Sequence, residues 1–210
     1  MNEILKYKNS VIILICYCFI FGLLHFIFNY YLFGYNPIVT LQKLSYDNSI
    51  VDNPFFWNSP IGITLKVLIE ILITSLLLYS GVIIHKLSLK LGQILIVVIL
   101  CHTVFLVEFL IDFIYLFTNK STKINLNEFS LGSLFSLTKL LGITSLNSLS
   151  FILETFSIFE LIYCILISYF FSKITERTFK ESLKLVLGYY ALPLLLWAVA
   201  ISFMSIMLIN

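Results

Sequence analysis

Charged side chains are scarce in this sequence, and their scarcity excludes an ordinary soluble fold. Only 11% of the 210 residues are Asp, Glu, Lys or Arg, whereas 60% are hydrophobic. Soluble domains carry roughly 25% charged residues because their surfaces face water. A chain with less than half of that share cannot cover itself with a polar surface. The net charge is only +2, so no nucleic-acid partner is predicted.

Motifs of known enzyme classes are also missing. The sequence has no His-Glu-x-x-His, no Gly-x-Ser-x-Gly, no P-loop and no glycine-rich dinucleotide turn. Cys16 and Cys18 would point about 200° apart on a helix, so they cannot easily share a ligand, and we expect inert thiols. No catalytic residue, metal or cofactor is predicted. An intramembrane enzyme stays open as a third alternative, and it requires His102 and a carboxylate within about 3 Å of a common point.

Long apolar stretches are abundant instead. A membrane-spanning helix needs about 20 mostly apolar residues. Five stretches meet this length, namely residues 10–33, 61–84, 91–117, 151–172 and 183–209. The first is too long for the apolar part of a secretory signal, so it is interpreted as a retained span. The sequence therefore predicts an all-α, polytopic membrane helix bundle that forms a single membrane domain over residues 1–210.

The distribution of Lys and Arg predicts the orientation. If the N-terminus lies in the cytoplasm, the cytoplasmic side of the membrane has eight basic residues in short segments beside the span ends. They are Lys6, Lys8, Lys86, Lys90, Lys173, Arg177, Lys180 and Lys184. The opposite side receives Lys43, Lys120, Lys123 and Lys139. The positive-inside rule therefore predicts a cytoplasmic N-terminus and an external C-terminus.

Two longer loops, residues 34–60 and 118–150, fall on the external side. Ile38, Leu41 and Leu44 recur at a spacing of three in the first loop, and leucines and phenylalanines follow one side of the segment around Gly132–Gly142 in the second. These patterns predict amphipathic helices that lie in the membrane interface. A re-entrant segment in the second loop is the alternative.

Ionisable side chains inside the predicted spans are the only candidate site. A charged group costs a few kcal/mol at the bilayer centre, so each should face protein or water rather than lipid. Glu70, Glu108 and Glu160 each lie roughly 13 Å from the outer end of their predicted helices, at about 1.5 Å per residue. The intramembrane polar cluster consists of Lys66, Glu70, His102, Glu108, Asp112 and Glu160.

Two interpretations of this polar cluster remain open. In the first, the residues line an outward-facing cavity that handles a proton, a cation or a lipid headgroup, because surplus carboxylates would raise some carboxyl pKa values. In the second, they hold the bundle together through pairing with Lys66 and through hydrogen bonds between helices. Convergence of Glu70, Glu108 and Glu160 on a water-accessible cavity would distinguish the two.

The C-terminal half resembles a known family. Residues Leu153–Tyr163 (LETFSIFELIY) lead into an apolar span, and a short basic turn, Ser172–Ser182 (SKITERTFKES), precedes the last one. This arrangement is similar to the bacterial branch of the Yip (Ypt-interacting protein) membrane-protein family. The resemblance implies five membrane helices, in agreement with the count above. It implies no agreed activity and no functional residue.

The predicted function follows from these features. We expect a non-enzymatic membrane protein of a bacterial cytoplasmic (inner) membrane that acts as a scaffold, an accessory subunit or a lipid-organising factor. The alternative is a proton- or cation-coupled small-solute transporter, or a subunit of one. The expected partners are the lipid bilayer and other membrane proteins or further copies of the chain, because Gly22, Gly81, Gly92 and Gly188 would permit close helix approach. Pro193 is predicted to kink the last span.

Overall fold

The computed structural model describes residues 10–33, 60–118, 136–137, 152–153 and 156–209, and these residues are helical almost throughout. The helices, in chain order, are α1 (Ser10–Phe33), α4 (Pro60–Ile84), α5 (Leu91–Thr118), α8 (Ile158–Thr175), α9 (Phe179–Val186), η2 (Leu187–Ala191) and α10 (Leu192–Ile209). In this part of the chain the only strand-like pairing is an isolated bridge between Ser136 and Ser157. The predicted all-α class is therefore confirmed.

The connection between α4 and α5 explains why both helix ends were predictable. Lys86 adopts a left-handed conformation with φ 51°. Its N–H donates to Ile83 O at 3.1 Å and the next N–H, of Leu87, donates to Val82 O at 2.9 Å, which is the Schellman arrangement that ends helices. The side chain of Gln93 accepts from Lys90 N at 3.0 Å and so satisfies a free amide where α5 begins.

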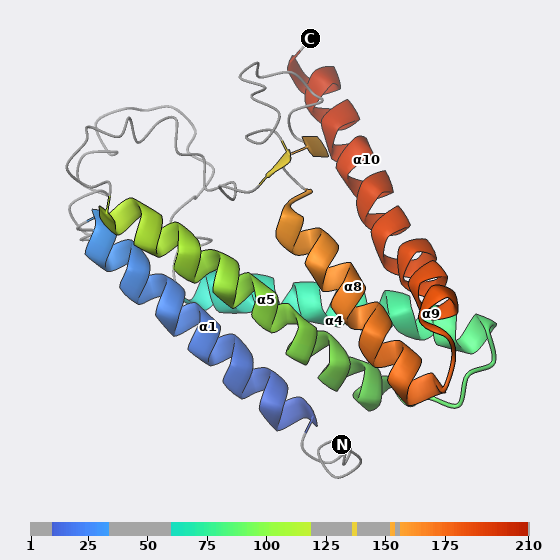
Figure 1. The fold of residues 1–210 in the computed structure, drawn as a ribbon. Coiled ribbons are helices and arrows are strands. Elements are labelled where there is room, and N and C mark those ends of the chain that lie inside the picture. The colour runs from blue at the N-terminus through green and yellow to red at the C-terminus, as the bar shows by residue number, and fades with distance from the viewer. Residues whose placement is uncertain (1–9, 34–59, 119–135, 138–151, 154–155, 210) are drawn as a thin grey trace. The chain divides into compact units, whose positions relative to one another are not determined.

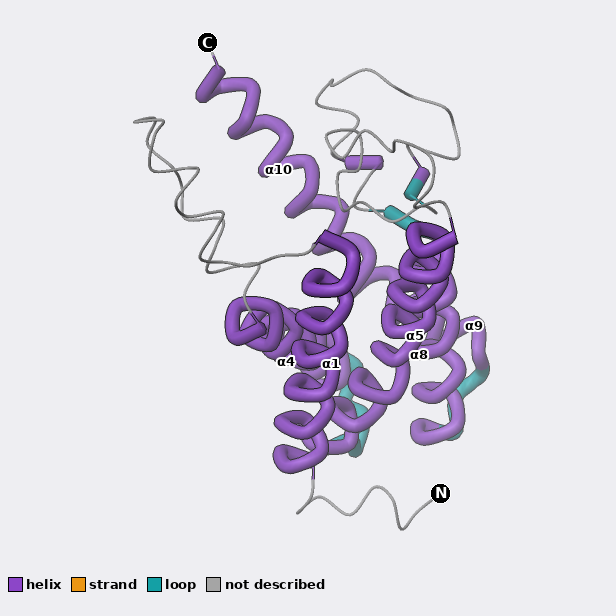
Figure 2. Tube along the Cα trace, turned by 90° about the vertical axis from the view of Figure 1, so that its left-hand side faces the viewer, coloured by secondary structure: helices purple, strands orange, loops and turns teal. Residues whose placement is uncertain are grey.

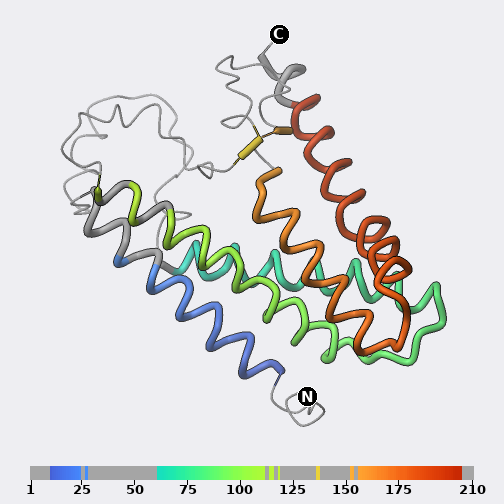
Figure 3. Tube along the Cα trace, viewed as in Figure 1, coloured from blue at the N-terminus to red at the C-terminus, as the bar shows by residue number. Residues whose placement is uncertain are grey.

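The connection between α8 and α9 is capped on both sides. Glu176 ends α8 in the left-handed conformation, with φ 56°. Thr178 and Glu181 then form a capping box, in which each side chain accepts a hydrogen bond from the backbone N–H of the other. From Phe179 the chain continues through α9, η2 and α10 as one helix, which Figure 3 allows the reader to follow.

The chain divides into two compact units, residues 1–73 and 74–210. In the first unit, α1 buries Leu14, Cys18 and Phe21, which recur at the spacing of one helix face. The α4 residues of this unit bury Ile63, Val67 and Ile71 in the same way. Each helix therefore has one covered face.

In the second unit, α8 packs beside α5 and runs in the opposite direction, so the start of α5 and the end of α8 lie at the same end (Figure 1). The first half of α5 is the most enclosed part, because the six consecutive residues from Ile94 to Ile99 are all buried. The α9 helix packs against α8, and α10 leads away from both toward the C-terminus, as Figure 2 shows from the side. Among residues 192–204 of α10, whose side chains the structure describes, Ala198 and Ser202 are the buried ones.

The outer faces of the helices are apolar. Large hydrophobic side chains stand exposed on every long helix, including Val11 at 59%, Ile73 at 52% and Leu196 at 61% of their surface. Water-facing surfaces rarely carry contiguous apolar areas of this extent. Four helices of the described residues are long and apolar enough to cross a membrane, namely Ile61–Ile84, Leu91–Ile111, Ile158–Thr175 and Phe179–Met204. The protein is therefore a multi-pass membrane protein.

The helix boundaries match the prediction closely in the first three spans and less well afterwards. The α1 helix has the predicted bounds of 24 residues, and its described apolar part is the shorter segment Ser10–Leu24. The fourth span begins at Ile158 instead of residue 151, because Ser157 caps it. The last helix begins at Phe179 instead of residue 183, because the capping box starts it. The amphipathic helices predicted in the two outer loops lie outside the described residues.

Candidate functional site: a buried glutamate–tyrosine cluster

A wide helical turn interrupts the last helix in front of Pro193. Residues Leu187–Ala191 form a π-helix, in which Leu192 N–H donates to Leu187 O, five residues back. Proline has no N–H, and in a regular α-helix its ring collides with the carbonyl four residues earlier, which here belongs to Tyr189. The wide turn relieves this collision, so it provides the distortion expected at Pro193. Single π turns occur frequently at functional sites.

Tyr190, within the π-helix, forms a hydrogen bond with the carboxyl group of Glu160 on α8. The Tyr190 hydroxyl donates to Glu160 Oε1 at 2.7 Å, and Tyr190 is only 7% exposed. The backbone at Glu160 is fixed by the cap of the same helix, because Ser157 Oγ accepts from Glu160 N at 3.2 Å. Glu160 therefore lies in the first turn of α8, where the helix dipole stabilises a negative charge.

A chain of aromatic ring contacts connects Tyr190 to α5. The ring of Tyr163 lies 5.4 Å from that of Tyr190, 5.1 Å from that of Phe105 and 6.1 Å from that of His102. His102 also packs edge-on against Phe105 at 4.9 Å. Tyr163 and His102 are 1% and 5% exposed. These five residues, including Glu160, form what we call the glutamate–tyrosine cluster.

Glu108 on α5 lies at the level of Glu160. Phe105 and Tyr163 mark one level of the antiparallel α5–α8 pair. Glu108 is three residues beyond Phe105 and Glu160 is three before Tyr163, so both carboxyl groups lie about 4.5 Å further toward the same end. A spacing of three also keeps each of them on the face that carries the ring. Glu108 Oε1 and Glu160 Oε2 are both buried atoms.

The members of the predicted intramembrane cluster fall in both compact units, so the cluster as a whole stays a prediction. His102, Glu108 and Glu160 belong to the second unit, whereas Lys66 and Glu70 belong to the first and both have exposed side chains on α4. Asp112 lies on α5, but its side chain is outside the described part of the chain. The equal depth predicted for three glutamates was based on a fourth span that begins at residue 151. Glu160 is instead the third residue of α8.

Sequence reasoning missed the two tyrosines and Phe105, because aromatic residues in apolar helices are common and have no distinguishing pattern. One signal was present: the sequence Gly188-Tyr189-Tyr190 stands just before Pro193. A proline within a span requires a local distortion, and polar rings beside that distortion are candidates for hydrogen bonding. The partner of such a ring cannot be read from one helix, because it depends on the register between two helices.

The chemistry of the cluster is that of a carboxyl group in an environment of low polarity. Such a group can accept hydrogen bonds that hold two helices together, or it can carry a proton. Metal binding has no support in the residues that the structure describes, since no three His, Cys, Asp or Glu side chains among them are grouped to hold an ion.

The chain was compared with protein-family models, with curated proteins and with solved structures, and none of them matches it. The resemblance to the bacterial Yip proteins therefore stays a prediction.

Proposed function

We propose that this protein is a non-enzymatic scaffold or accessory component of a bacterial cytoplasmic membrane, with its N-terminus in the cytoplasm. The multi-pass membrane fold and the basic residues at the α8–α9 connection support the location and orientation. The resemblance to bacterial Yip proteins agrees with five spans. Its partners, on this proposal, are other membrane proteins or further copies of the chain.

The observation that carries the proposal is the hydrogen bond from Tyr190 to Glu160 at 2.7 Å. It joins the last helix to α8 through polar atoms. Apolar contact alone drives helix association weakly in lipid, because the surrounding acyl chains are equally apolar. A buried polar bond between helices therefore fits a protein whose task is to keep a defined shape within the membrane.

Proton-coupled transport is the second candidate, and Glu108 favours it. Glu108 and Glu160 place two buried carboxyl oxygens at one level of the α5–α8 interface, and carboxyl groups inside membrane spans are found in proton relays. A carboxyl pair of this kind, with His102 nearby, could take up and release a proton. The glutamate–tyrosine cluster is then the site at which transport would be coupled to the proton gradient.

Replacing Glu160 by glutamine separates the two candidates. The amide oxygen of glutamine can still accept the hydrogen bond from Tyr190, but the amide carries no titratable proton. A scaffold with Glu160→Gln should keep its thermal stability in detergent and the proteins that copurify with it, whereas Glu160→Ala should lose stability. The matched control is Glu176→Gln, which changes an exposed glutamate at the end of the same helix.

Proton flux into proteoliposomes, followed with a pH-sensitive dye, is the measurement that can contradict the scaffold proposal. If the wild-type protein and Glu176→Gln carry protons while Glu160→Gln does not, and the three are equally folded, then the scaffold proposal is wrong and the transporter replaces it. If none of them carries protons and copurification persists, the scaffold proposal stands.

A further inference from the structure

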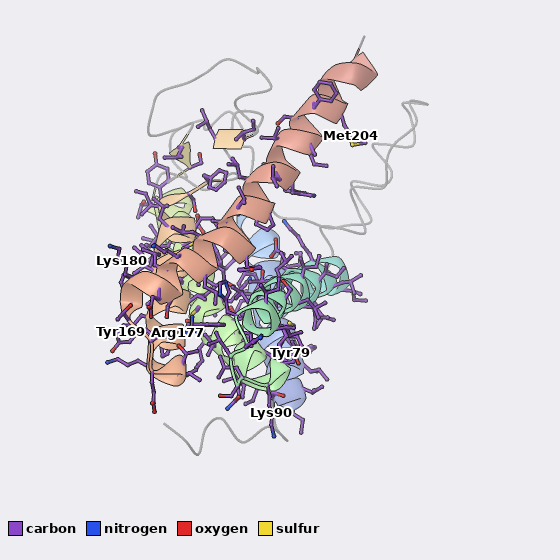
Figure 4. All side chains as sticks on the ribbon, turned by 90° about the vertical axis from the view of Figure 1, so that its right-hand side faces the viewer. Tyr79, Lys90, Tyr169, Arg177, Lys180 and Met204 are labelled. Atoms are coloured by element: carbon purple, nitrogen blue, oxygen red, sulfur yellow. The ribbon has the colours of Figure 1, made fainter. Side chains whose placement is uncertain are left out.

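A group of exposed basic side chains surrounds the connection between α8 and α9. Figure 4 shows Tyr169, Arg177 and Lys180 on one side of this connection. We call the group the basic edge, and it consists of Lys173, Arg177, Lys180 and Lys184, all of which are exposed. The two acidic residues of the same segment, Glu176 and Glu181, leave a positive balance, and Glu181 is already engaged in the capping box. The basic edge therefore offers cations at the end of two apolar helices.

An exposed stripe on α8 runs from the basic edge into the apolar region. The stripe consists of four residues at intervals of four, which places them on one helix face: Lys173, Tyr169, Ile165 and Leu161. Tyr169, Ile165 and Leu161 are 49%, 51% and 56% exposed. The Lys173 ammonium lies 5.4 Å from the centre of the Tyr169 ring, so the ring attracts it. The stripe spans about 18 Å at 1.5 Å per residue, comparable with the ~15 Å thickness of one leaflet's hydrocarbon.

A second stripe of the same kind follows the last helix. Lys180 and Lys184 occupy its first turns, and the exposed leucines Leu187, Leu192 and Leu196 continue along it. The opposite side of α9 is buried through residues such as Leu185 and Val186, so this helix rests on the bundle and turns its lysines outward. Both stripes start with cations and continue with hydrocarbon-compatible side chains.

We propose that the basic edge binds an anionic phospholipid of the leaflet in which it lies. The headgroup phosphate contacts the cations of Arg177, Lys180 and Lys184, and the acyl chains extend along the apolar parts of the two stripes. The positive charge of the basic edge favours an anionic headgroup. Because each basic segment continues into an exposed apolar one, the ligand must also have long apolar chains, as a lipid does. An acidic segment of a soluble protein would match the cations alone and would leave both apolar stripes uncovered.

Lipid binding by the purified protein tests this proposal. The protein in detergent is incubated with equal amounts of phosphatidylglycerol and phosphatidylcholine, and native mass spectrometry counts the bound lipids. We expect the wild-type protein to prefer phosphatidylglycerol. A Lys or Arg close to an anionic headgroup changes binding by about five-fold, so Lys180→Gln with Lys184→Gln should reduce the preference by up to about thirty-fold. High salt should reduce it as well.

Two further variants keep the proposal falsifiable if the double glutamine variant folds poorly. Lys180→Arg with Lys184→Arg retains both charges and should retain the preference. Glu176→Asn removes a negative charge at a position where the backbone is left-handed, which asparagine tolerates well, and should strengthen the preference. Equal binding of the two lipids by the wild-type protein overturns the proposal. So does an unchanged preference in a folded double glutamine variant, or capture of an acidic polypeptide without any lipid preference.

Discussion

Replacing Gly81 by alanine tests how the end of α4 packs against the last helix. An alanine Cβ at this position would lie 2.7 Å from Tyr189 Cδ2, 2.8 Å from Cγ and 3.1 Å from Cε2. Atoms of this kind cannot approach so closely, so the ring would have to move. The ring has a second contact one turn further along the chain, since His85 packs edge-on against it with 5.7 Å between ring centres.

The expected cost follows from the geometry. Inserting one methyl group into a contact that cannot relax freely destabilises a packed interface by about 1–3 kcal/mol. Gly188 offers a matched control, because a Cβ there meets no atom within 4 Å. Gly188→Ala should therefore leave the free energy of unfolding unchanged or raise it slightly, since alanine favours the helix over glycine by about 1 kcal/mol.

Reversible unfolding in mixed detergent micelles, followed by circular dichroism, measures these free energies. Tyr189→Ala removes the ring that obstructs the new methyl group, so Gly81→Ala should cost little in that background. The packing argument is refuted if Gly81→Ala matches the wild-type stability. It is refuted equally if its cost persists in full when Tyr189 is alanine.

Four further predictions concern the helix caps and the glutamate–tyrosine cluster. Tyr190→Phe removes the donor to Glu160 and should lower the free energy of unfolding by about 1–3 kcal/mol. Ser157→Ala removes the cap of α8 and should lower it by about 1 kcal/mol. Lys86→Gly places glycine at a left-handed residue and should raise it by about 1 kcal/mol. Pro193→Ala removes the cause of the wide turn, so Tyr190→Phe should cost less in that background. The same unfolding assay measures each of these changes.

The helix ends were predictable where the sequence carries explicit stop and start signals. The polar segment between Ile84 and Leu91 ends α4 and begins α5, and the structure supplies both caps within it. The fourth span was predicted to begin too early because residues 151–153, Phe-Ile-Leu, already begin an apolar run. Its real start depends on one serine, Ser157, whose hydroxyl caps the helix, and serine is too common in this sequence to reveal that role.

The candidate site was predictable only in its acidic part. Composition alone marked Glu108, Glu160 and His102, because ionisable side chains inside an apolar span require an explanation. Their aromatic surroundings depend on the register between α5 and α8 and on the wide turn of the last helix. Neither can be derived from periodicity within one segment. Lys66 and Glu70 were grouped with the others by estimated depth, and this grouping stays a prediction.

The wide turn explains how one short segment serves two neighbouring helices. Tyr189 packs against Gly81 and His85 on α4, whereas the next residue, Tyr190, reaches Glu160 and Tyr163 on α8. Consecutive helix residues point about 100° apart, so adjacent tyrosines can meet partners on different sides. Both tyrosines lie within the wide turn just before Pro193. We therefore expect the polar and aromatic contacts that join these helices to depend on Pro193, three residues beyond Tyr190.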